Sequence, residues 1–432
     1  MFGRAPQFIS ALDIGSKNTR AVIAQLCEVD EDVEQGVGGK GSTSLKIVGV
    51  GEEQTRGVEG GEFIDIAKAA SSIRAAADAA SVMASVDMKN VVVSLSGRHV
   101  RTVDSEGAIS LTGSSSSKET RAMREIVDSD LQHALEDAKS VTVRSDEKTL
   151  HTILQDFAVD SRKFIKNPRG KTGERLAAQV KVVIASQPAI NDLEKALGEA
   201  HLSARLIVLQ SLASARASLE RDEMEDGVLL IDLGMGTSDA IIYFGGSPRY
   251  MSCLAMGGDF VTKDVADCLG CGADRAEEIK ITTGCVVEKA LPLEGRVESL
   301  LSDKDENRPD PRVVRAISSR YAEILLTLRN DIRRADAEKF IKRSVVLTGG
   351  ASASVGLCGL ASRIFGVKAQ VRNCTDTECF GGALKDPCFA SVMGLLLYGS
   401  EPAAGISALS DKNRSLFRRA WDALTCRNVA LT

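Results

Sequence analysis

The sequence lacks several features that would place it in a familiar class. No apolar run approaches the ~20 residues that a membrane-spanning helix needs, and residues 1–11 show no apolar stretch typical of a secretory signal. The ten cysteines form no framework, which favours a reducing compartment. Aromatic residues make up only 4% of the chain, with a single tryptophan, and the net charge of -5 gives no reason to expect nucleic acid as a partner.

Convincing metal and nucleophile motifs are also missing. Cys268 and Cys271 form a CxxC pair, but no second pair or suitably spaced histidine accompanies them, so two ordinary thiols near a helix end are expected. There is no GxSxG elbow and no HExxH. Residues 38–42 lack the Lys-Ser/Thr step of a P-loop. If the protein binds phosphate, it would therefore use a structural motif other than a P-loop.

The patterning that is present predicts an α/β protein of two lobes. The length of 432 residues exceeds one ordinary core, and the 44% hydrophobic and 26% charged content is that of a soluble folded body. Apolar strands at 8–12, 19–26 and 45–50 precede an Ala-rich helix near 65–86, and the strand at 228–232 repeats the opening pattern. We expect a cleft between the two lobes.

Two glycine-containing turns carry the functional signal. Asp13 heads one such turn after a strand, and Asp232 heads another, 219 positions later. A turn of this kind points several N–H groups the same way and lets a triphosphate approach closely. Either turn alone is more often a plain hairpin, but the pair indicates a duplicated nucleotide site. Each aspartate would hold Mg²⁺ through water, since oxygen ligands suit that ion.

A third turn, Gly349-Gly350, follows the apolar strand 344–347 and can lie flat against an adenine or ribose. Together the three motifs resemble the phosphate 1, phosphate 2 and adenosine motifs of the actin, DnaK-type chaperone and sugar kinase superfamily. Other stretches resemble one branch of it, the FtsA family of bacterial cell-division proteins. These stretches are 93–99, 150–160, 165–168, 257–264, 276–280 and 392–399.

The resemblance covers nearly the whole chain and implies a two-lobed actin-like (ribonuclease H-like) α/β fold with an inserted 1C subdomain. It also implies the domain boundaries and the residues of an ATP and Mg²⁺ site. The implied domains are lobe 1 (1–86, 164–195, 370–399), subdomain 1C (87–163), lobe 2 (196–369), a linker (400–413) and a terminal helix (414–426). The implied nucleotide-binding residues are Asp13, Gly15, Ser16, Lys17, Asn18, Asp232, Gly234, Gly236, Thr237, Glu277, Lys280, Gly349 and Gly350.

Two departures from the family pattern bear on turnover. Met235 replaces the middle glycine of the second phosphate motif. Gln210 is the nearest candidate for the group that positions water in hydrolytic relatives, and it is a weak catalytic candidate. We therefore expect an ATP-binding cytoskeletal adaptor rather than an enzyme, with slow hydrolysis at most.

The C-terminal segment predicts an amphipathic helix. On a helical wheel its apolar side chains fall within an arc of about 140°, and residues 411–427 hold five basic residues against two acidic. Such a helix can dock on the protein's own body, but the basic bias and the tryptophan favour an anionic membrane surface. The predicted membrane-contacting residues are Leu416, Phe417, Arg418, Arg419, Trp421 and Leu424.

The resemblance implies a bacterial division protein that self-associates into filaments through lobe and 1C contacts. It would tether polymers of the tubulin-like FtsZ to the cytoplasmic face of the inner membrane at the division site, together with other division proteins. A PilM-like pilus-assembly adaptor, which shares the fold, is the nearest alternative. A small-molecule kinase is a weaker one, because no segment suggests a carboxylate base beside an acceptor pocket.

Overall fold

The computed structural model describes residues 7–28, 43–111, 123–287, 310–372, 374 and 384–400. Within these residues the chain forms two compact units. The first draws on Met1–His99, Pro188–Gly246 and Tyr250–Ser400, and the second on Val100–Gln187 and Ser247–Arg249. The predicted linker beyond residue 400 and the predicted helix 414–426 lie outside the described residues. No helix in the described ranges is long and apolar enough to cross a membrane.

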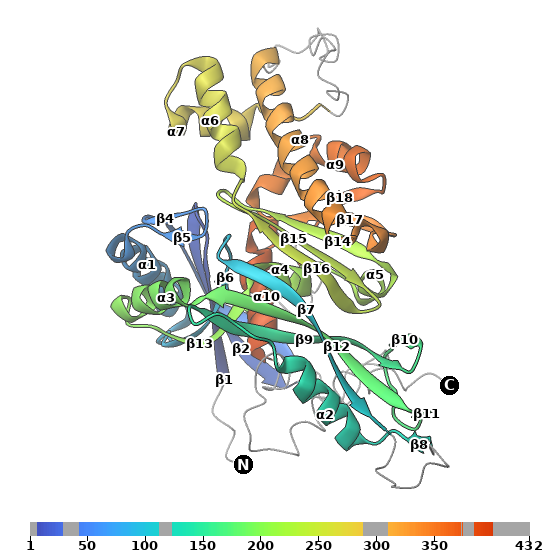
Figure 1. The fold of residues 1–432 in the computed structure, drawn as a ribbon. Helices are drawn as coiled ribbons and strands as arrows, with labels where there is room; N and C mark the ends of the chain where they lie inside the picture. The colour runs from blue at the N-terminus through green and yellow to red at the C-terminus, as the bar shows by residue number, and fades with distance from the viewer. Residues whose placement is uncertain are drawn as a thin grey trace. The chain divides into compact units, whose positions relative to one another are not determined.

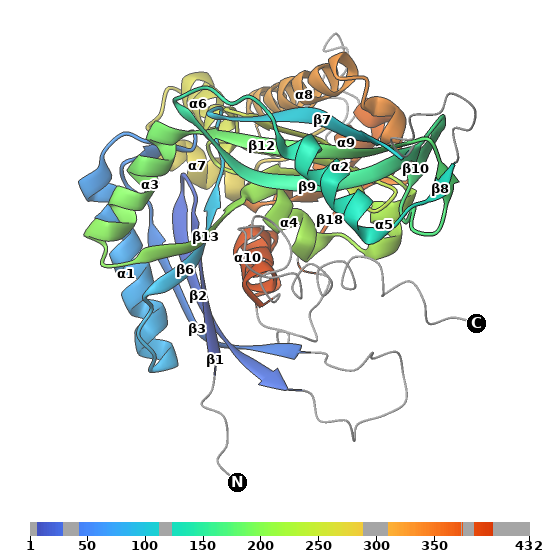
Figure 2. The same ribbon diagram turned by 60° about the horizontal axis from the view of Figure 1, so that its bottom comes forward.

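The first sheet of the first unit has the strand order β13-β6-β1-β2-β3. Its strands are β1 (Gln7–Ile14), β2 (Asn18–Glu28), β3 (Thr43–Gln54), β6 (Asn90–Leu95) and β13 (Ser203–Leu209). Helix α1 (Ile66–Ala84) packs on β2 and β3, where its alanines permit a close approach. Figure 2 shows α1 and α3 (Gln187–Glu199) on one face of this sheet and α10 (Ala390–Ser400) on the other.

The second sheet of this unit has the order β16-β15-β14-β17-β18. Its strands are β14 (Val228–Leu233), β15 (Ser238–Phe244), β16 (Ser247–Leu254), β17 (Ser344–Thr348) and β18 (Ala369–Val371). Helices α6 (Gly258–Leu269), α7 (Ala273–Thr282), α8 (Pro311–Arg334) and α9 (Leu357–Phe365) also contribute to its core. Helix α4 (Gln210–Ser218) packs against β14 and against α10, which lies on the first sheet.

The two sheets repeat the same local arrangement, as the sequence predicted. In the first, β1 pairs antiparallel with β2 and parallel with β6. In the second, β14 pairs antiparallel with β15 and parallel with β17. Asp13 and Asp232 occupy equivalent places near the ends of β1 and β14. The duplicated architecture therefore holds at the level of strand pairing (Figure 1).

Short elements complete the first unit. The two-residue strands β4 (Val58–Glu59) and β5 (Glu62–Phe63) form a hairpin of their own. The remaining elements are α5 (Arg221–Asp226), η2 (Glu338–Phe340), η3 (Gly350–Ala353) and η4 (Pro387–Phe389). Cys268 in α6 and Cys271 beyond its end are free thiols, as expected.

The second unit is a four-stranded sheet of order β10-β9-β12-β7 with α2 packed against it. Its elements are β7 (Val100–Ser110), β8 (Arg124–Glu125), α2 (Asp128–Lys139), β9 (Glu147–Val159), β10 (Arg162–Ile165), β11 (Thr172–Gly173) and β12 (Arg175–Ser186). This unit differs from the predicted inserted segment 87–163. Residues 90–95 form β6 of the first sheet, and β12 belongs here because it pairs with both β7 and β9.

The one helix described in the second unit follows a short strand. Helix α2 begins at Asp128, because Arg124 and Glu125 form β8, which pairs with Thr172 and Gly173 of β11. The Asp130 carboxylate accepts the Val127 N–H at 3.0 Å and so fixes the start of the helix.

His151, on β9, is completely buried opposite Val183 of β12. Burial lowers the pKa of His151 from 6.5 to about 3. Between these values the unfolded chain binds a proton that the folded chain does not, so the free energy of unfolding falls as the pH drops below 6.5. The His151→Phe variant lacks this contribution. Its free energy of unfolding should therefore fall less steeply with decreasing pH than that of the parent, by about 1.4 kcal/mol per pH unit.

Urea unfolding at several pH values between 7 and 4 measures this effect. The matched control is His133→Gln, which changes an exposed histidine on α2 of the same unit and should keep the parent slope. A His151→Phe profile parallel to that of the parent protein would contradict the assignment.

Candidate functional site

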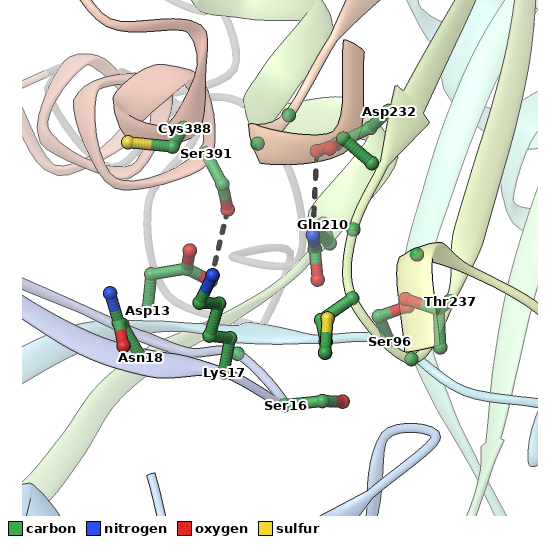
Figure 3. A pocket seen from close by; sticks show the side chains of 18 of the residues that line it. Asp13, Ser16, Lys17, Asn18, Ser96, Gln210, Asp232, Thr237, Cys388 and Ser391 are labelled. Atoms are coloured by element: carbon green, nitrogen blue, oxygen red, sulfur yellow. Dashed lines mark hydrogen bonds between the residues drawn. The ribbon is translucent and has the colours of Figure 1, made fainter. Parts of the chain in front are cut away.

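A cavity of about 400 Å³ in the first unit is lined by both glycine turns and by the Gly349-Gly350 turn. Residues that are far apart in sequence meet here because the equivalent ends of β1 and β14 both open onto it. In Figure 3, Asp13, Ser16, Lys17 and Asn18 come from one strand pair, and Asp232 and Thr237 from the other. Every nucleotide-site residue named from the sequence lines this cavity.

Asp13 is 4% exposed and held by two hydroxyls. Ser94 Oγ donates to its Oδ1 at 2.6 Å, and Ser391 Oγ donates to the same oxygen at 3.2 Å. Burial raises the pKa of Asp13, while the Ser94 hydrogen bond and the charge of Arg20 lower it. Both hydrogen bonds end on one oxygen, so Oδ2 stays outside this pair of contacts.

Asp232 has a matching environment. It is 3% exposed, and its Oδ2 accepts from Ser214 Oγ at 2.5 Å and from Gln210 Nε2 at 3.3 Å. Burial, with the nearby charge of Asp13, raises the pKa of Asp232 to about 6 against the two hydrogen bonds, which lower it. Gln210 is thus a partner of the second carboxylate at the start of α4, and its catalytic role stays a prediction (Figure 3).

The two glycine turns approach each other closely at Ser16 and Gly236. A Cβ placed on Gly236 would lie 2.5 Å from Ser16 Oγ, so the contact requires glycine. The second turn is held from behind by the start of α6, where Gly258 N–H donates to Gly234 O at 3.0 Å and Asp259 N–H to Met235 O at 2.9 Å. Met235 therefore supports the turn through its backbone carbonyl, and the presence of a side chain at this position does not prevent that hydrogen bond.

The polar wall on the α7 side is a network around Glu277. Lys17 Nζ donates to Glu277 Oε1 at 2.8 Å and Lys280 Nζ contacts Oε2 at 2.5 Å. Thr262 Oγ1 also donates to Oε2 at 2.5 Å. Burial raises the pKa of Glu277, but these three donors outweigh it and bring the value to about 2. The Lys17 contact joins the first phosphate turn directly to α7.

The remaining wall contains the Gly349-Gly350 turn and several apolar side chains. Gly349 has φ +82, and any side chain there would collide with Asp232 Oδ1, so this turn depends on glycine. Beyond it the cavity is lined by Tyr321, Ser354, Val355 and Ile281. Val355 is 69% exposed and Ile281 63%, which leaves apolar surface open to a ligand.

Sequence reasoning missed the hydroxyls and the cation around the two aspartates. Ser94 lies at the end of β6, Ser391 at the start of α10 and Ser214 inside α4, so no local motif links them to Asp13 or Asp232. Arg20 pairs with Asp13 across the β1–β2 register, contacts Glu52 at 2.8 Å and stacks over Phe389 at 5.0 Å. The sequence signal that could have identified Arg20 is its position seven residues after Asp13, which places it opposite Asp13 in a tight hairpin.

The carboxylate pair suits a hydrated cation. No group of three or more His, Cys, Asp or Glu side chains in the described ranges is arranged to hold a metal ion by itself. Magnesium keeps several waters and takes one or two carboxylates together with phosphate oxygens. Among the described residues, no hydrogen bond reaches Oδ2 of Asp13 or Oδ1 of Asp232, so each of these oxygens can accept from a water of such an ion.

Comparison with known proteins identifies the family. The family model for "Cell division protein FtsA" matches residues 229–394, and the model for "SHS2 domain inserted in FTSA" matches residues 97–184. The cell division protein FtsA of Pseudomonas aeruginosa is 32% identical over 404 residues, covering 91% of this chain and 89% of that protein. That of Borreliella burgdorferi is also 32% identical, over 398 residues and 91% of both chains.

The solved structures support the fold. A chain of the PilM–PilN type IV pilus biogenesis complex aligns with a TM-score of 0.58 and 18% identity, over 91% of this chain and 99% of that one. The predicted α/β actin-like fold with an inserted subdomain is confirmed, and the SHS2 match coincides closely with the unit Val100–Gln187. This chain is a member of the FtsA family of cell division proteins.

Proposed function

We propose that the protein binds ATP with Mg²⁺ in the cavity and uses it to fix the arrangement of the two sheets. The terminal phosphates would lie between the turns at Gly15-Ser16 and Gly234–Thr237, and backbone N–H groups of these turns would donate to them. Asp13 and Asp232 would hold the hydrated ion. The observation that carries this assignment is the pairing of two buried carboxylates beside two glycine turns, each with one oxygen that accepts no hydrogen bond from the described part of the chain.

The proposed positions of the ribose and the adenine follow from the polarity of the cavity walls. Glu277 and Lys280 would face the ribose hydroxyls, and Gly349-Gly350 with Val355 and Ile281 would cover the adenine. Lys17 would exchange its Glu277 partner for a phosphate oxygen. Each contact uses a group whose chemistry matches the part of the ligand that it meets.

Hydrolysis of the bound ATP is proposed to be slow, so that the nucleotide acts mainly by holding the two sheets in a fixed arrangement. Hydrolysis needs a group free to orient the attacking water. Gln210, the candidate for that role, donates its amide to Asp232 Oδ2 at 3.3 Å. Its remaining amide oxygen can accept from a water but cannot act as a base.

The proposed cellular role is to self-associate and to anchor FtsZ polymers to the cytoplasmic face of the inner membrane during division. Similarity over about nine-tenths of the chain to curated division proteins supports it. So does the basic, tryptophan-bearing segment 414–426, which is proposed as an interfacial helix. Self-association would align many such segments and convert weak single contacts into firm attachment.

The nucleotide proposal predicts that Asp13→Asn and Asp232→Asn each weaken Mg²⁺–ATP binding by at least about tenfold, because each removes one charge facing the ion. Titration of ATP into the purified chain by calorimetry, with and without Mg²⁺, measures the loss. Asp78→Asn, on the exposed face of α1, is the matched control. If both variants bound Mg²⁺–ATP as tightly as the parent chain, the assignment of the ion to this cavity would be wrong.

The membrane proposal predicts that a chain ending at Asn413 loses nearly all binding to anionic liposomes, because the apolar and basic side chains of 414–426 are gone. Co-sedimentation of liposomes with FtsZ and either form of the chain tests it. FtsZ should follow only the intact chain into the pellet. Equal sedimentation of the truncated form, or FtsZ remaining in the supernatant with the intact form, would refute the tether.

A further inference from the structure

The β4–β5 hairpin sits beside both phosphate turns, although no motif marked it. Its ladder pairs Val58 with Phe63 and Glu59 with Glu62, which leaves Gly60 and Gly61 as a two-residue tip. Both tip residues have positive φ, +55 and +82, the conformation of a type I′ turn that favours glycine. The hairpin is therefore a tight and well-defined element.

The tip lies against the second phosphate turn. A Cβ on Gly236 would lie 2.9 Å from the backbone nitrogen of Gly60, as well as 2.5 Å from Ser16 Oγ. Gly61 lines the cavity, and a side chain there would collide with the carbonyl oxygen of Ser96 at the end of β6. Three glycine-bearing segments thus converge on one point.

The tip carries donors without partners. The N–H groups of Gly60 and Gly61 lie outside the hairpin ladder, and within the described part of the chain no hydrogen bond uses either of them. Backbone N–H groups that are partly shielded from water favour an acceptor. Two successive N–H groups at a positive-φ turn form a small concavity that suits an anionic oxygen.

The charges of the hairpin are arranged away from the cavity. Val58 and Phe63 line it, and since side chains alternate along a strand, Glu59 and Glu62 face the other way. Glu62 is also paired with Arg98, whose Nε donates to Oε1 at 2.8 Å. The carboxylates of the hairpin therefore do not oppose a phosphate at its tip.

The hairpin is anchored to the first phosphate turn. Thr55 N–H donates to Lys17 O at 2.9 Å, and the Thr19 and Thr55 hydroxyls are 2.8 Å apart. At the base of the hairpin, Ile64 N–H donates to Gly57 O at 2.9 Å. The Thr55 contacts therefore hold the start of the hairpin against the first turn.

We propose that the β4–β5 hairpin is a third phosphate-binding element, in which the N–H groups of Gly60 and Gly61 donate to the terminal phosphate of the bound nucleoside triphosphate. This inference rests on the proposed ATP site. It assigns the recognition of the terminal phosphate, and hence the discrimination of ATP from ADP, to a segment separate from the two aspartate turns.

The test compares a non-hydrolysable ATP analogue with ADP, both with Mg²⁺, on the full chain. Gly61→Ala, which pushes the tip away from Ser96, should weaken the analogue at least about tenfold and ADP by less than about threefold. Gly366→Ala is the matched control, because Gly366 also has a positive φ of +74, a Cβ there meets nothing within 4 Å, and the residue does not line the cavity. It should bind both ligands as the parent chain does.

Amide hydrogen exchange of the parent chain gives a readout that does not depend on folding of a variant. Protection of residues 58–63 should rise with the analogue and stay near the ligand-free level with ADP. If the analogue binds and Asp13→Asn weakens it, but these amides exchange equally with both ligands, the hairpin inference is overturned while the ATP site stands. If neither ligand binds, the proposed function itself fails.

Discussion

Replacing Gly236 with alanine is expected to weaken ATP binding by at least about 100-fold, equivalent to roughly 2.7 kcal/mol. The added Cβ would stand 2.5 Å from Ser16 Oγ and 2.9 Å from the Gly60 nitrogen, closer than real Cβ contacts allow. The serine hydroxyl can rotate away, but the Gly60 nitrogen is backbone and cannot move alone. Overpacking of this kind costs ~1 to 3 kcal/mol, and here it separates the groups that converge on the phosphates.

Calorimetric titration with Mg²⁺–ATP measures this effect, with thermal unfolding as a check on the fold. Gly198→Ala is the matched control, since a Cβ at that position of α3 meets nothing within 4 Å. It should leave affinity unchanged. A Gly236→Ala chain that binds ATP within a few-fold of the parent would show that the two phosphate turns do not act together.

The two glycine turns that line the cavity could be predicted from sequence because their signal is local, while phosphate binding by them stays a prediction. Asp13 and Gly15, like Asp232 and Gly234, lie within one turn after an apolar strand, and the repeat of this pattern carries the architecture. The partners of the aspartates could not be predicted. Ser94 and Ser391 reach Asp13 from 81 and 378 positions away, through parallel strand pairing and helix docking that no short pattern encodes.

The limits of the inserted unit were misjudged for a similar reason. The run at 90–95 has the apolar character of any buried strand, and only its pairing with β1 and β13 assigns it to the first sheet. Strand β12 joins the second unit through its ladders to β7 and β9. Strand type is a local property, whereas sheet membership depends on long-range register.

Replacing Arg249 with methionine is expected to lower the free energy of unfolding of the second unit by about 3 to 5 kcal/mol. Arg249 Nη1 donates to Asp156 Oδ2 at 2.6 Å and to Gln155 Oε1 at 3.3 Å, and its guanidinium lies 5.5 Å from the centre of the Phe164 ring. The two charged side chains are 5% and 1% exposed. Methionine fills much of the same volume, so the main effect is a buried carboxylate left without its cation.

The double variant Arg249→Met with Asp156→Leu separates that cause from lost packing. Exchange of a buried pair for apolar residues of similar size is often neutral, so most of the lost stability should return. The control is Arg175→Met, whose pair with Glu106 in the same unit is 54% and 45% exposed and should contribute less than about 1 kcal/mol. Urea unfolding at pH 7 compares all four chains. If the double variant were as unstable as Arg249→Met alone, packing around the guanidinium, and not the unpaired Asp156 charge, would be the source of the loss.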